Sequence, residues 1–239
     1  MKFLRAFISI IRIAIFGTWS FCCILLGTFL SLITLSRRAT IFTAKYIWPP
    51  VSFFIMGARF RVHGRKHDLP AVSYVVVSNH SSYLDIPAIT SAIPFSLRFI
   101  AKKEFKRVPF LGWYLWMAET IMIDRKNTVA AKESLKIAAN YIANGHHVAI
   151  YPEGTSSHDG TIKPFKKGAF HLAEDAKAHI LPVRIDGAYH VWPSARKLDM
   201  RMGNIDVIIG DPIPPEVYLK MDIDERTEFV RQTIVKLKK

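Results

Sequence analysis

Residues 73–77 (SYVVV), followed after Ser78 by Asn79-His80-Ser81-Ser82-Tyr83-Leu84-Asp85, form the stretch that decides the fold. A run of consecutive β-branched and aromatic residues is typical of a strand that is covered on both faces. Polar residues begin directly where this strand is expected to end. Because ligands of open α/β sheets bind beyond the carboxyl ends of the strands, we expect a functional site at this position.

The same kind of strand recurs along the chain. From about residue 62, short β-branched runs alternate with longer amphipathic stretches, which predicts an α/β fold with a mixed central sheet flanked by helices. Further strands are expected at 99–102, 120–124, 148–151, 180–185 and 205–209, and helices at 128–144, 168–178 and 224–239. Thr128 is the expected N-cap of the helix at 128–144, and Gly145 its end.

The N-terminal part is apolar. Residues 13–36 contain no charged side chain, and basic residues flank them on both sides. This run is too long for a signal peptide and long enough to cross a bilayer, which needs roughly 20 residues of helix. Residues 41–60 form a second apolar stretch, interrupted by Lys45 and Pro49-Pro50, which predicts a shorter, broken helix in or on the membrane. We therefore expect membrane-anchoring helices at 1–60 and an α/β domain at 61–239; the alternative is that both stretches are buried core helices.

The chain is strongly basic. It has 33 Lys and Arg against 19 Asp and Glu, a formal net charge of +14, with 50% hydrophobic residues. This balance favours a polyanionic partner, either nucleic acid or an anionic membrane surface. Because no nucleic-acid-binding motif is present, we expect membrane lipids and no nucleic acid as partners. The two cysteines, Cys22 and Cys23, are adjacent, which indicates no disulfide framework and suits a reducing compartment.

Several chemistries lack their usual motifs. The sequence has no G-x-S-x-G turn, no phosphate-binding G-x-x-x-x-G-K-[ST] loop, no G-x-G-x-x-G and no H-E-x-x-H. His63 and His67 are four residues apart, but Gly64 and the polar surroundings favour a loop, and we expect no metal site.

His80 and Asp85 form an H-x-x-x-x-D pattern directly after the strand at 73–77. An imidazole can take a proton from an alcohol near neutral pH, and a neighbouring carboxylate fixes its tautomer and stabilises the imidazolium. A spacing of five does not place two side chains on one helical face. The pair therefore requires His80 in a loop and Asp85 on the first turn of the following helix, with Ser81 or Ser82 as the expected N-cap.

A second polar loop follows the strand expected at 148–151, in the sequence Tyr151-Pro152-Glu153-Gly154-Thr155. Glycine allows a backbone to approach a ligand closely, and Glu153 and Thr155 offer hydrogen bonds to a hydroxylated acceptor. The alternative is a plain turn.

The ordered combination of motifs resembles the 1-acyl-glycerol-3-phosphate acyltransferase family of glycerolipid acyltransferases. It comprises His80-x4-Asp85, Ala101-Lys102-Lys103-Glu104, Val108-Pro109-Phe110-Leu111-Gly112, Ile123-Asp124-Arg125, Tyr151-Pro152-Glu153-Gly154-Thr155, Lys163-Pro164-Phe165-Lys166-Lys167-Gly168-Ala169-Phe170 and Leu181-Pro182-Val183. The resemblance covers roughly residues 60–215, and it implies that 61–239 is an acyltransferase domain.

The resemblance also implies a reaction. His80 would act as general base, oriented by Asp85, while an acyl group passes directly from acyl-CoA or acyl-carrier protein to the free hydroxyl of 1-acylglycerol-3-phosphate, giving phosphatidic acid without a cofactor. Residues that would bind the glycerol part of the acceptor are Glu153, Gly154 and Thr155, and those that would hold its phosphate are Arg125 with Lys102 or Lys103. Similar positive charge on both flanks of residues 13–36 does not settle the orientation of this run. A helical hairpin that enters only one leaflet would keep both of its ends on the cytoplasmic side. We therefore expect the cytoplasmic membrane as location, with the catalytic domain on the cytoplasmic side.

One position departs from the family. Many members have arginine directly after Glu-Gly-Thr, where it is taken to bind the phosphate, whereas this chain has Ser156. Arg125 could compensate, or the acceptor could be another lysolipid, such as lyso-ornithine lipid or a lysophospholipid with a larger head group. A non-catalytic basic protein that binds membranes or nucleic acid is the remaining alternative.

Overall fold

The computed structural model describes residues 2–64, 71–124, 127–196 and 198–239. Its centre is a seven-stranded sheet in the order β1-β7-β6-β2-β5-β3-β4. The strands are β1 Ala58–Gly64, β2 Tyr74–Ser78, β3 Leu97–Lys102, β4 Ile121–Ile123, β5 His147–Ile150, β6 His179–Asp186 and β7 Gly203–Ile209. Neighbouring strands are parallel except β6 and β7, so the predicted mixed sheet is confirmed.

Strand β2 occupies the middle of the sheet, between β5 and β6. All five of its residues are buried, as its continuous β-branched pattern predicts. Tyr74 and Val76 belong to the apolar core on one face of the sheet, and Val75 and Val77 to the core on the other. Because β2 is parallel to both neighbours, the carboxyl ends of β2, β5 and β6 lie at the same edge.

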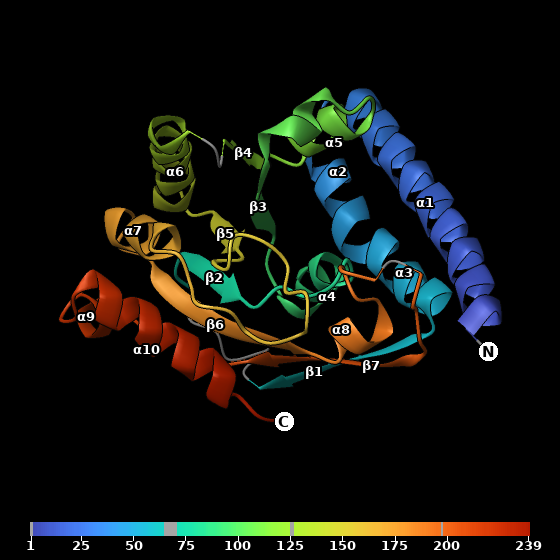
Figure 1. Cartoon of the computed structure of the whole chain (residues 1–239). Helices are drawn as coiled ribbons and strands as arrows, with labels where there is room; N and C mark the ends of the chain where they lie inside the picture. Colours follow the sequence, from blue (N-terminus) through green and yellow to red (C-terminus); the bar gives the residue numbers. More distant parts are fainter. Residues whose placement is uncertain (1, 65–70, 125–126, 197) are drawn as a thin grey trace.

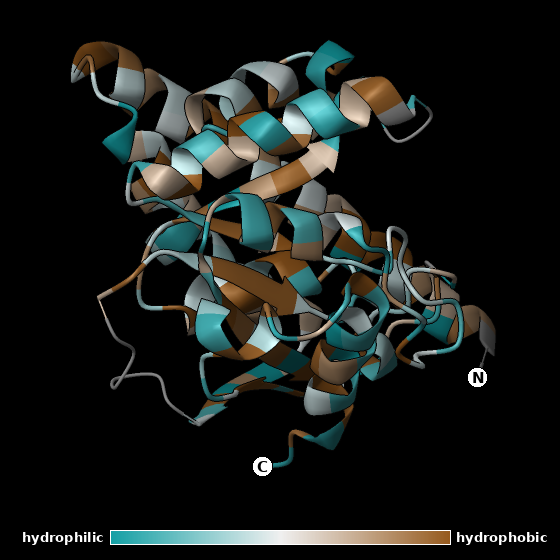
Figure 2. Cartoon of the chain, turned by 90° about the vertical axis from the view of Figure 1, so that its left-hand side faces the viewer, coloured by the Kyte–Doolittle hydropathy of each residue, from teal (hydrophilic) through white to brown (hydrophobic). Residues whose placement is uncertain are grey.

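Helices cover both faces of the sheet (Figure 1). The helices are α1 Lys2–Ile33, α2 Arg38–Phe42, α3 Trp48–Met56, α4 Asp85–Ala92, α5 Leu111–Met117, α6 Thr128–Ala143, α7 Gly168–Asp175, α8 Ala188–Val191, α9 Pro215–Tyr218 and α10 Ile223–Lys236, with a π-helical turn η1 at Thr43–Ile47 and a 3₁₀ turn η2 at Lys103–Arg107. Residues of α3, α4 and α8 pack in one core, and residues of α6, α7 and α10 in the other. Figure 2 shows hydrophobic strands between helices that are partly hydrophilic.

The N-terminal helices lie along one side of the sheet, with α1 outermost (Figure 1). The segment Phe3–Ile33 is long and apolar enough to cross a membrane, and only 11% of its most hydrophobic part is buried inside the protein. This low burial argues against the alternative of a soluble core helix. The predicted break in the second apolar stretch is wrong: the backbone stays helical from α2 through the π-helical turn at Thr43–Ile47, which contains Lys45, into α3, where Pro49 and Pro50 occupy the first turn.

Two expectations near the start of the sheet are wrong. The helix predicted to reach Phe60 ends at Met56, because Gly57 has a φ of +65° and the chain then enters β1 at Ala58. His63 lies in β1 rather than in a loop, where its Nε2 is 2.8 Å from Asp206 Oδ1 on β7. His67 is outside the described residues.

The other boundaries differ from the expectations by a few residues. Asn127, and not Thr128, is the N-cap of α6, because its side chain accepts hydrogen bonds from the backbone N–H groups of Val129 and Ala130. Gly145 ends this helix as expected, with a φ of +83°. Helix α7 ends at Asp175 and α10 at Lys236, both earlier than predicted.

Candidate active site

His80 and Asp85 meet at the carboxyl end of β2. His80 lies in the loop after the strand, and Asp85 is the first residue of α4. His80 Nδ1 is 2.8 Å from Asp85 Oδ2, so the geometry predicted from their spacing is confirmed. The Asp85 side chain is fully buried, whereas 24% of the His80 side chain is exposed. The pair therefore has a buried carboxylate behind an imidazole that solvent or a substrate can reach.

Further hydrogen bonds determine which nitrogen of His80 bears the proton. Asp85 Oδ2 also accepts hydrogen bonds from the backbone N–H groups of Ser81 (2.6 Å) and Ser82 (2.8 Å). An oxygen that accepts from two such groups is unprotonated, so His80 Nδ1 is the donor to it. In the neutral ring Nε2 is then the basic nitrogen, and it has no hydrogen-bond partner among the described residues. His80 is thereby prepared to accept a proton.

The same hydrogen bonds correct the expected helix cap. The N-cap position of α4 is Leu84, with no side-chain cap, so neither Ser81 nor Ser82 is the N-cap. The Ser82 hydroxyl instead donates to the carbonyl of Trp192, at 2.7 Å, and fixes the His80 loop to the segment after α8. Asp85 uses its carboxylate to bind the serine backbones, which orients the loop and the imidazole together.

Glu153 connects the His80 loop to the loop after β5. Its Oε1 accepts from the backbone N–H of His80 at 2.8 Å, and its Oε2 from that of Lys163 at 3.2 Å. Burial raises the pKa of Glu153, while these two backbone hydrogen bonds act in the opposite direction. Because both oxygens already accept hydrogen bonds from the protein, the carboxylate holds the two loops at a fixed separation.

Tyr151 contacts His80, which the sequence analysis did not predict. Its ring stacks on that of His80, with centroids 4.4 Å apart and an interplanar angle of 22°. Burial raises the pKa of Tyr151 well above its usual value, so the phenol keeps its proton. Tyr151 stands in the Tyr-Pro-Glu-Gly-Thr motif. Its position directly before Pro152, at the end of a strand, was the one feature of the sequence that could have indicated a role in the site.

Asn79 attaches the carboxyl end of β2 to β6 through two hydrogen bonds with Ile185. Its side-chain oxygen accepts from the backbone N–H of Ile185 at 2.8 Å, and its amide nitrogen donates to the carbonyl of the same residue at 2.9 Å. The carbonyl of His80 accepts from the backbone N–H of Ser157 at 2.7 Å. His80 is thus held by neighbours from β6 and from the loop after β5.

Two lysines flank the Glu-Gly-Thr segment. Gly154 has a φ of +74°, and a Cβ atom built there would lie 2.7 Å from Lys166 Cε and 2.8 Å from Lys166 Nζ, so the lysine side chain lies directly against the glycine. Lys163 Nζ donates to the carbonyl of Ser156 at 3.5 Å. Within the described part of the chain, neither lysine forms an ion pair. Thr155 is exposed.

The remaining predicted residues are more distant from His80. Lys102 is the last residue of β3 and Lys103 follows it, two strands from β2, which is roughly 10 Å along the edge of the sheet. Lys102 Nζ is 3.6 Å from Glu104 Oε1, and Lys103 forms an ion pair with Asp124. Arg125 lies outside the described residues. Among those that are described, no group of three or more His, Cys, Asp or Glu could hold a metal ion.

Comparisons with known proteins place the chain in a family. A family model described as Acyltransferase matches residues 59–186. Human 1-acyl-sn-glycerol-3-phosphate acyltransferase alpha is 33% identical over 183 residues, which are 76% of this chain and 64% of that protein. The chain therefore spans just under two thirds of the human relative. The Saccharomyces cerevisiae 1-acyl-sn-glycerol-3-phosphate acyltransferase is 32% identical over 238 residues, covering 98% of this chain and 77% of that protein.

The fold also has a counterpart among solved structures. The crystal structure of PlsC from Thermotoga maritima, a 1-acyl-sn-glycerophosphate acyltransferase, superposes with a TM-score of 0.80 at 24% identity, covering 98% of this chain and 95% of that one. The family match extends over more than half of the chain, and the yeast relative matches nearly all of it. The chain belongs to the acyltransferase family.

Proposed function

We propose that the chain transfers a fatty acyl group from a thioester to the free hydroxyl of 1-acylglycerol-3-phosphate, forming phosphatidic acid. The observation that supports this most is the His80–Asp85 pair, in which a buried carboxylate leaves Nε2 of an accessible imidazole as the basic nitrogen. The reactions named for the human and yeast relatives are of this kind.

His80 acts as the general base. Its Nε2 accepts the proton of the acceptor hydroxyl as the hydroxyl oxygen attacks the thioester carbonyl of acyl-CoA or acyl-carrier protein. The new C–O bond forms, the C–S bond breaks, and the leaving thiolate takes the proton back from the imidazolium. A positioned base of this type accelerates a reaction by roughly 10²- to 10⁴-fold. No covalent acyl-enzyme is formed, because the acceptor oxygen attacks the thioester directly.

Three neighbours position His80. Asp85 holds Nδ1 and stabilises the imidazolium once it forms. Glu153 fixes the backbone of His80 through its N–H, and Tyr151 restrains the ring by stacking on it. In this role Glu153 acts on the acceptor indirectly, through the separation of the two loops, while Gly154 and Thr155 face the acceptor's glycerol part.

Fixed cations would hold the phosphate of the acceptor. Lys163 and Lys166 lie beside the segment Gly154–Ser156, and their ammonium groups are near the position where many family members have arginine. They supply positive charge that Ser156 cannot. Lys102 and Lys103 lie where β3 ends, at the carboxyl edge of the sheet. Charge-assisted hydrogen bonds from either of them, or from Arg125 as the sequence suggests, suit a phosphate.

Membrane attachment is part of the proposal. The helices that precede Gly57, of which α1 is the longest, anchor the chain in the cytoplasmic membrane, and the catalytic domain, whose sheet begins with β1 at Ala58, lies on its cytoplasmic side. The low burial of α1 and the exposed apolar side chains along it support the membrane attachment. A soluble lysolipid is not required, because both the acceptor and the product stay in the bilayer.

The test is a panel of acceptors. Purified full-length protein is supplied with labelled acyl-CoA or acyl-carrier protein and with 1-acylglycerol-3-phosphate, lyso-ornithine lipid and lysophospholipids with larger head groups. The expected product is labelled phosphatidic acid, and His80→Ala is the matched inactive control. A product from lyso-ornithine lipid alone would overturn the acceptor assignment. No product from any acceptor, together with salt-sensitive DNA binding, would favour the non-catalytic alternative.

A further inference from the structure

A group of exposed apolar side chains lies outside the N-terminal helices, on η2, the following loop and α5. Its members are Phe105 (46% exposed), Val108 (42%), Phe110 (43%), Trp113 (64%) and Trp116 (62%). We call these five residues the 105–116 patch. Five large exposed apolar residues lie within twelve positions, two of them tryptophan, and the rings of Phe110 and Trp113 meet with centroids 5.7 Å apart. A concentration of exposed apolar side chains of this kind marks an interaction site.

The backbone holds the patch in place. Gly112 N donates to the carbonyl of Val108 at 2.8 Å, and a Cβ atom built at Gly112 would lie 2.3 Å from the carbonyl oxygen of Lys106. The loop is therefore folded tightly against the first turn of α5, where only glycine fits. Phe110 has a φ of +62°, which is unfavourable for a residue other than glycine. The segment keeps this conformation while 43% of Phe110 stays exposed.

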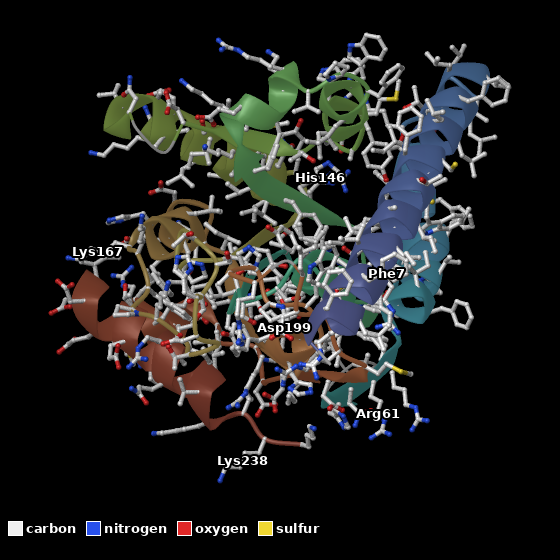
Figure 3. All side chains as sticks on the ribbon, turned by 45° about the vertical axis from the view of Figure 1, so that its right-hand side comes forward. Phe7, Arg61, His146, Lys167, Asp199 and Lys238 are labelled. Atoms are coloured by element: carbon white, nitrogen blue, oxygen red, sulfur yellow. The ribbon has the colours of Figure 1, made fainter. Side chains whose placement is uncertain are left out.

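The patch is continuous with α1. The ring of Phe110 meets that of Phe21 edge to face, with centroids 5.4 Å apart. The Arg37 guanidinium lies 4.6 Å from the centroid of the Trp116 ring. Figure 1 shows α5 beside one end of α1, and in Figure 3 α1, on which Phe7 is labelled, lies on the far side of the molecule from Lys167. We therefore expect the patch and the exposed apolar side chains of α1 to contact the same apolar surroundings.

Exposed cations near the patch indicate what this environment is. Lys106 and Arg107 are exposed within the same segment, and neither forms an ion pair in the described part of the chain. Arg38 is exposed at the nearby start of α2. Tryptophan beside lysine and arginine is the composition found where protein meets the headgroups of a bilayer, and cations at that level attract anionic lipids.

We propose that the 105–116 patch is a second membrane-contact surface, which lies at headgroup level on an anionic bilayer beside α1. It rests on the membrane attachment in the proposed function and extends the membrane-contacting surface beyond residues 1–60. Because β3 runs directly into η2, this contact turns the carboxyl edge of the sheet toward the lipid. A lysolipid acceptor then reaches His80 without leaving the bilayer surface.

The test places a fluorescent probe at single cysteines in the full chain. In a Cys22→Ser, Cys23→Ser background, NBD is attached at Trp113→Cys, at Phe29→Cys on α1 (60% exposed), or at Val129→Cys on α6 (71% exposed). The labelled proteins are reconstituted in mixed phosphatidylcholine–phosphatidylglycerol vesicles. Phospholipid brominated in its acyl chains quenches probes in the bilayer, and aqueous iodide quenches probes in solvent.

The probe at position 113 is expected to lose most of its emission to brominated lipid, as the probe at 29 does, whereas the probe at 129 responds to iodide alone. Quenching at 29 but not at 113 overturns the proposal and leaves membrane attachment intact. No quenching at 29 contradicts both. Protection at 113 from both quenchers also overturns the proposal, because it indicates a protein partner or a second copy of the chain.

A double charge reversal, at Lys106 and Arg107, tests whether attraction to anionic lipid contributes to this membrane contact. Each cation near an anionic surface favours association by roughly fivefold. Lys106→Glu combined with Arg107→Glu should therefore reduce lipid quenching at position 113 in anionic vesicles to the level measured in pure phosphatidylcholine. Equal quenching with and without the substitutions would overturn the role of these two residues.

Discussion

Two histidines occupy opposite ends of neighbouring parallel strands. His80 follows the carboxyl end of β2, and His147 is the first residue of β5. Carboxylates surround His80, since Asp85 binds its ring and Glu153 its backbone. His147 instead accepts a hydrogen bond at Nδ1 from the backbone N–H of Tyr74, at 3.2 Å.

The surroundings of His147 oppose protonation. Burial, followed by the charges of His146, Arg98 and Lys45, lowers the pKa of His147 to about 4. A cavity of about 460 Å³ borders this end of the sheet, and its lining contains cationic side chains but no acidic ones. His146, labelled in Figure 3, belongs to that lining. This strand pair thus presents two imidazoles in different surroundings: burial and neighbouring cations keep His147 neutral, whereas the ring of His80 lies beside a carboxylate.

The largest expected effect is the difference in acyl-transfer rate between two single substitutions, His80→Ala and His147→Ala. His80→Ala removes the base and should lower the rate of acyl transfer by roughly 10²- to 10⁴-fold. His147→Ala should leave the rate near that of the wild type, because this ring is distant from the reacting atoms. Both rates are measured with labelled acyl-CoA and 1-acylglycerol-3-phosphate. Equal losses in the two variants would remove the distinction between the two ends of the sheet.

Asp85→Asn should have the next largest effect. The amide oxygen can still accept from Ser81 and Ser82, but the ring of His80 then faces an amide in place of an anion. The imidazolium loses its stabilisation and the tautomer is no longer fixed, so kcat is expected to fall by at most the roughly 10²- to 10⁴-fold that the base contributes, with little change in KM. Steady-state kinetics against acceptor concentration separate the two parameters. A wild-type kcat would show that the carboxylate is not needed.

Lys166→Ala should mainly weaken binding of the acceptor. If its ammonium group binds the phosphate, its loss removes a charge-assisted hydrogen bond, and KM for 1-acylglycerol-3-phosphate should rise about tenfold. Lys167→Ala is the matched control, because the adjacent Lys167 forms an ion pair with Asp224 at 2.8 Å. The same rise in KM for both variants would indicate a general effect of surface charge.

The smallest effect concerns stability. The pKa of His147 lies near 4 in the folded chain, against an ordinary value of 6.5. As the pH falls through this window, the unfolded chain binds a proton that the folded chain does not, so the free energy of unfolding decreases. His147→Asn keeps an acceptor for Tyr74 and lacks this titration. Allowing for partial exposure, the wild type should lose up to about 2 kcal/mol relative to the variant.

Denaturant titration of both proteins in detergent, at about pH 7 and about pH 5, measures this difference. Parallel changes in the two free energies of unfolding would mean that the surroundings of His147 do not disfavour its charged form.

The sequence predicted the central strands and the His80–Asp85 geometry because both depend on local patterns. A fully buried strand needs consecutive apolar residues, and a spacing of five suits a loop followed by a helix. β1 escaped prediction because the apolar stretch before it was extended to Phe60, although Arg59, Arg61 and His63 alternate with Phe60 and Val62 as in a half-buried strand. Its pairing with β7, on which Asp206 faces His63, depends on residues far away in the chain.

Details of the site depend on such distant contacts as well. Glu153 stands in a motif that is easily found, but the direction of its carboxylate follows from the backbone of His80, 73 residues earlier. The same holds for the stacking of Tyr151 and for the side chain of Lys166 against Gly154. A motif identifies residue types at a strand end, whereas the folded loops decide which of them touch.

The most direct measurement is the position of the proton on His80. Nitrogen-15 chemical shifts of the labelled imidazole in the detergent-solubilised protein distinguish a protonated from an unprotonated ring nitrogen. In neutral His80 the expected result is a proton on Nδ1, directed at Asp85, with Nε2 unprotonated, and a loss of this preference in Asp85→Asn. A proton on Nε2 in the wild type would contradict the assignment of that nitrogen as the base.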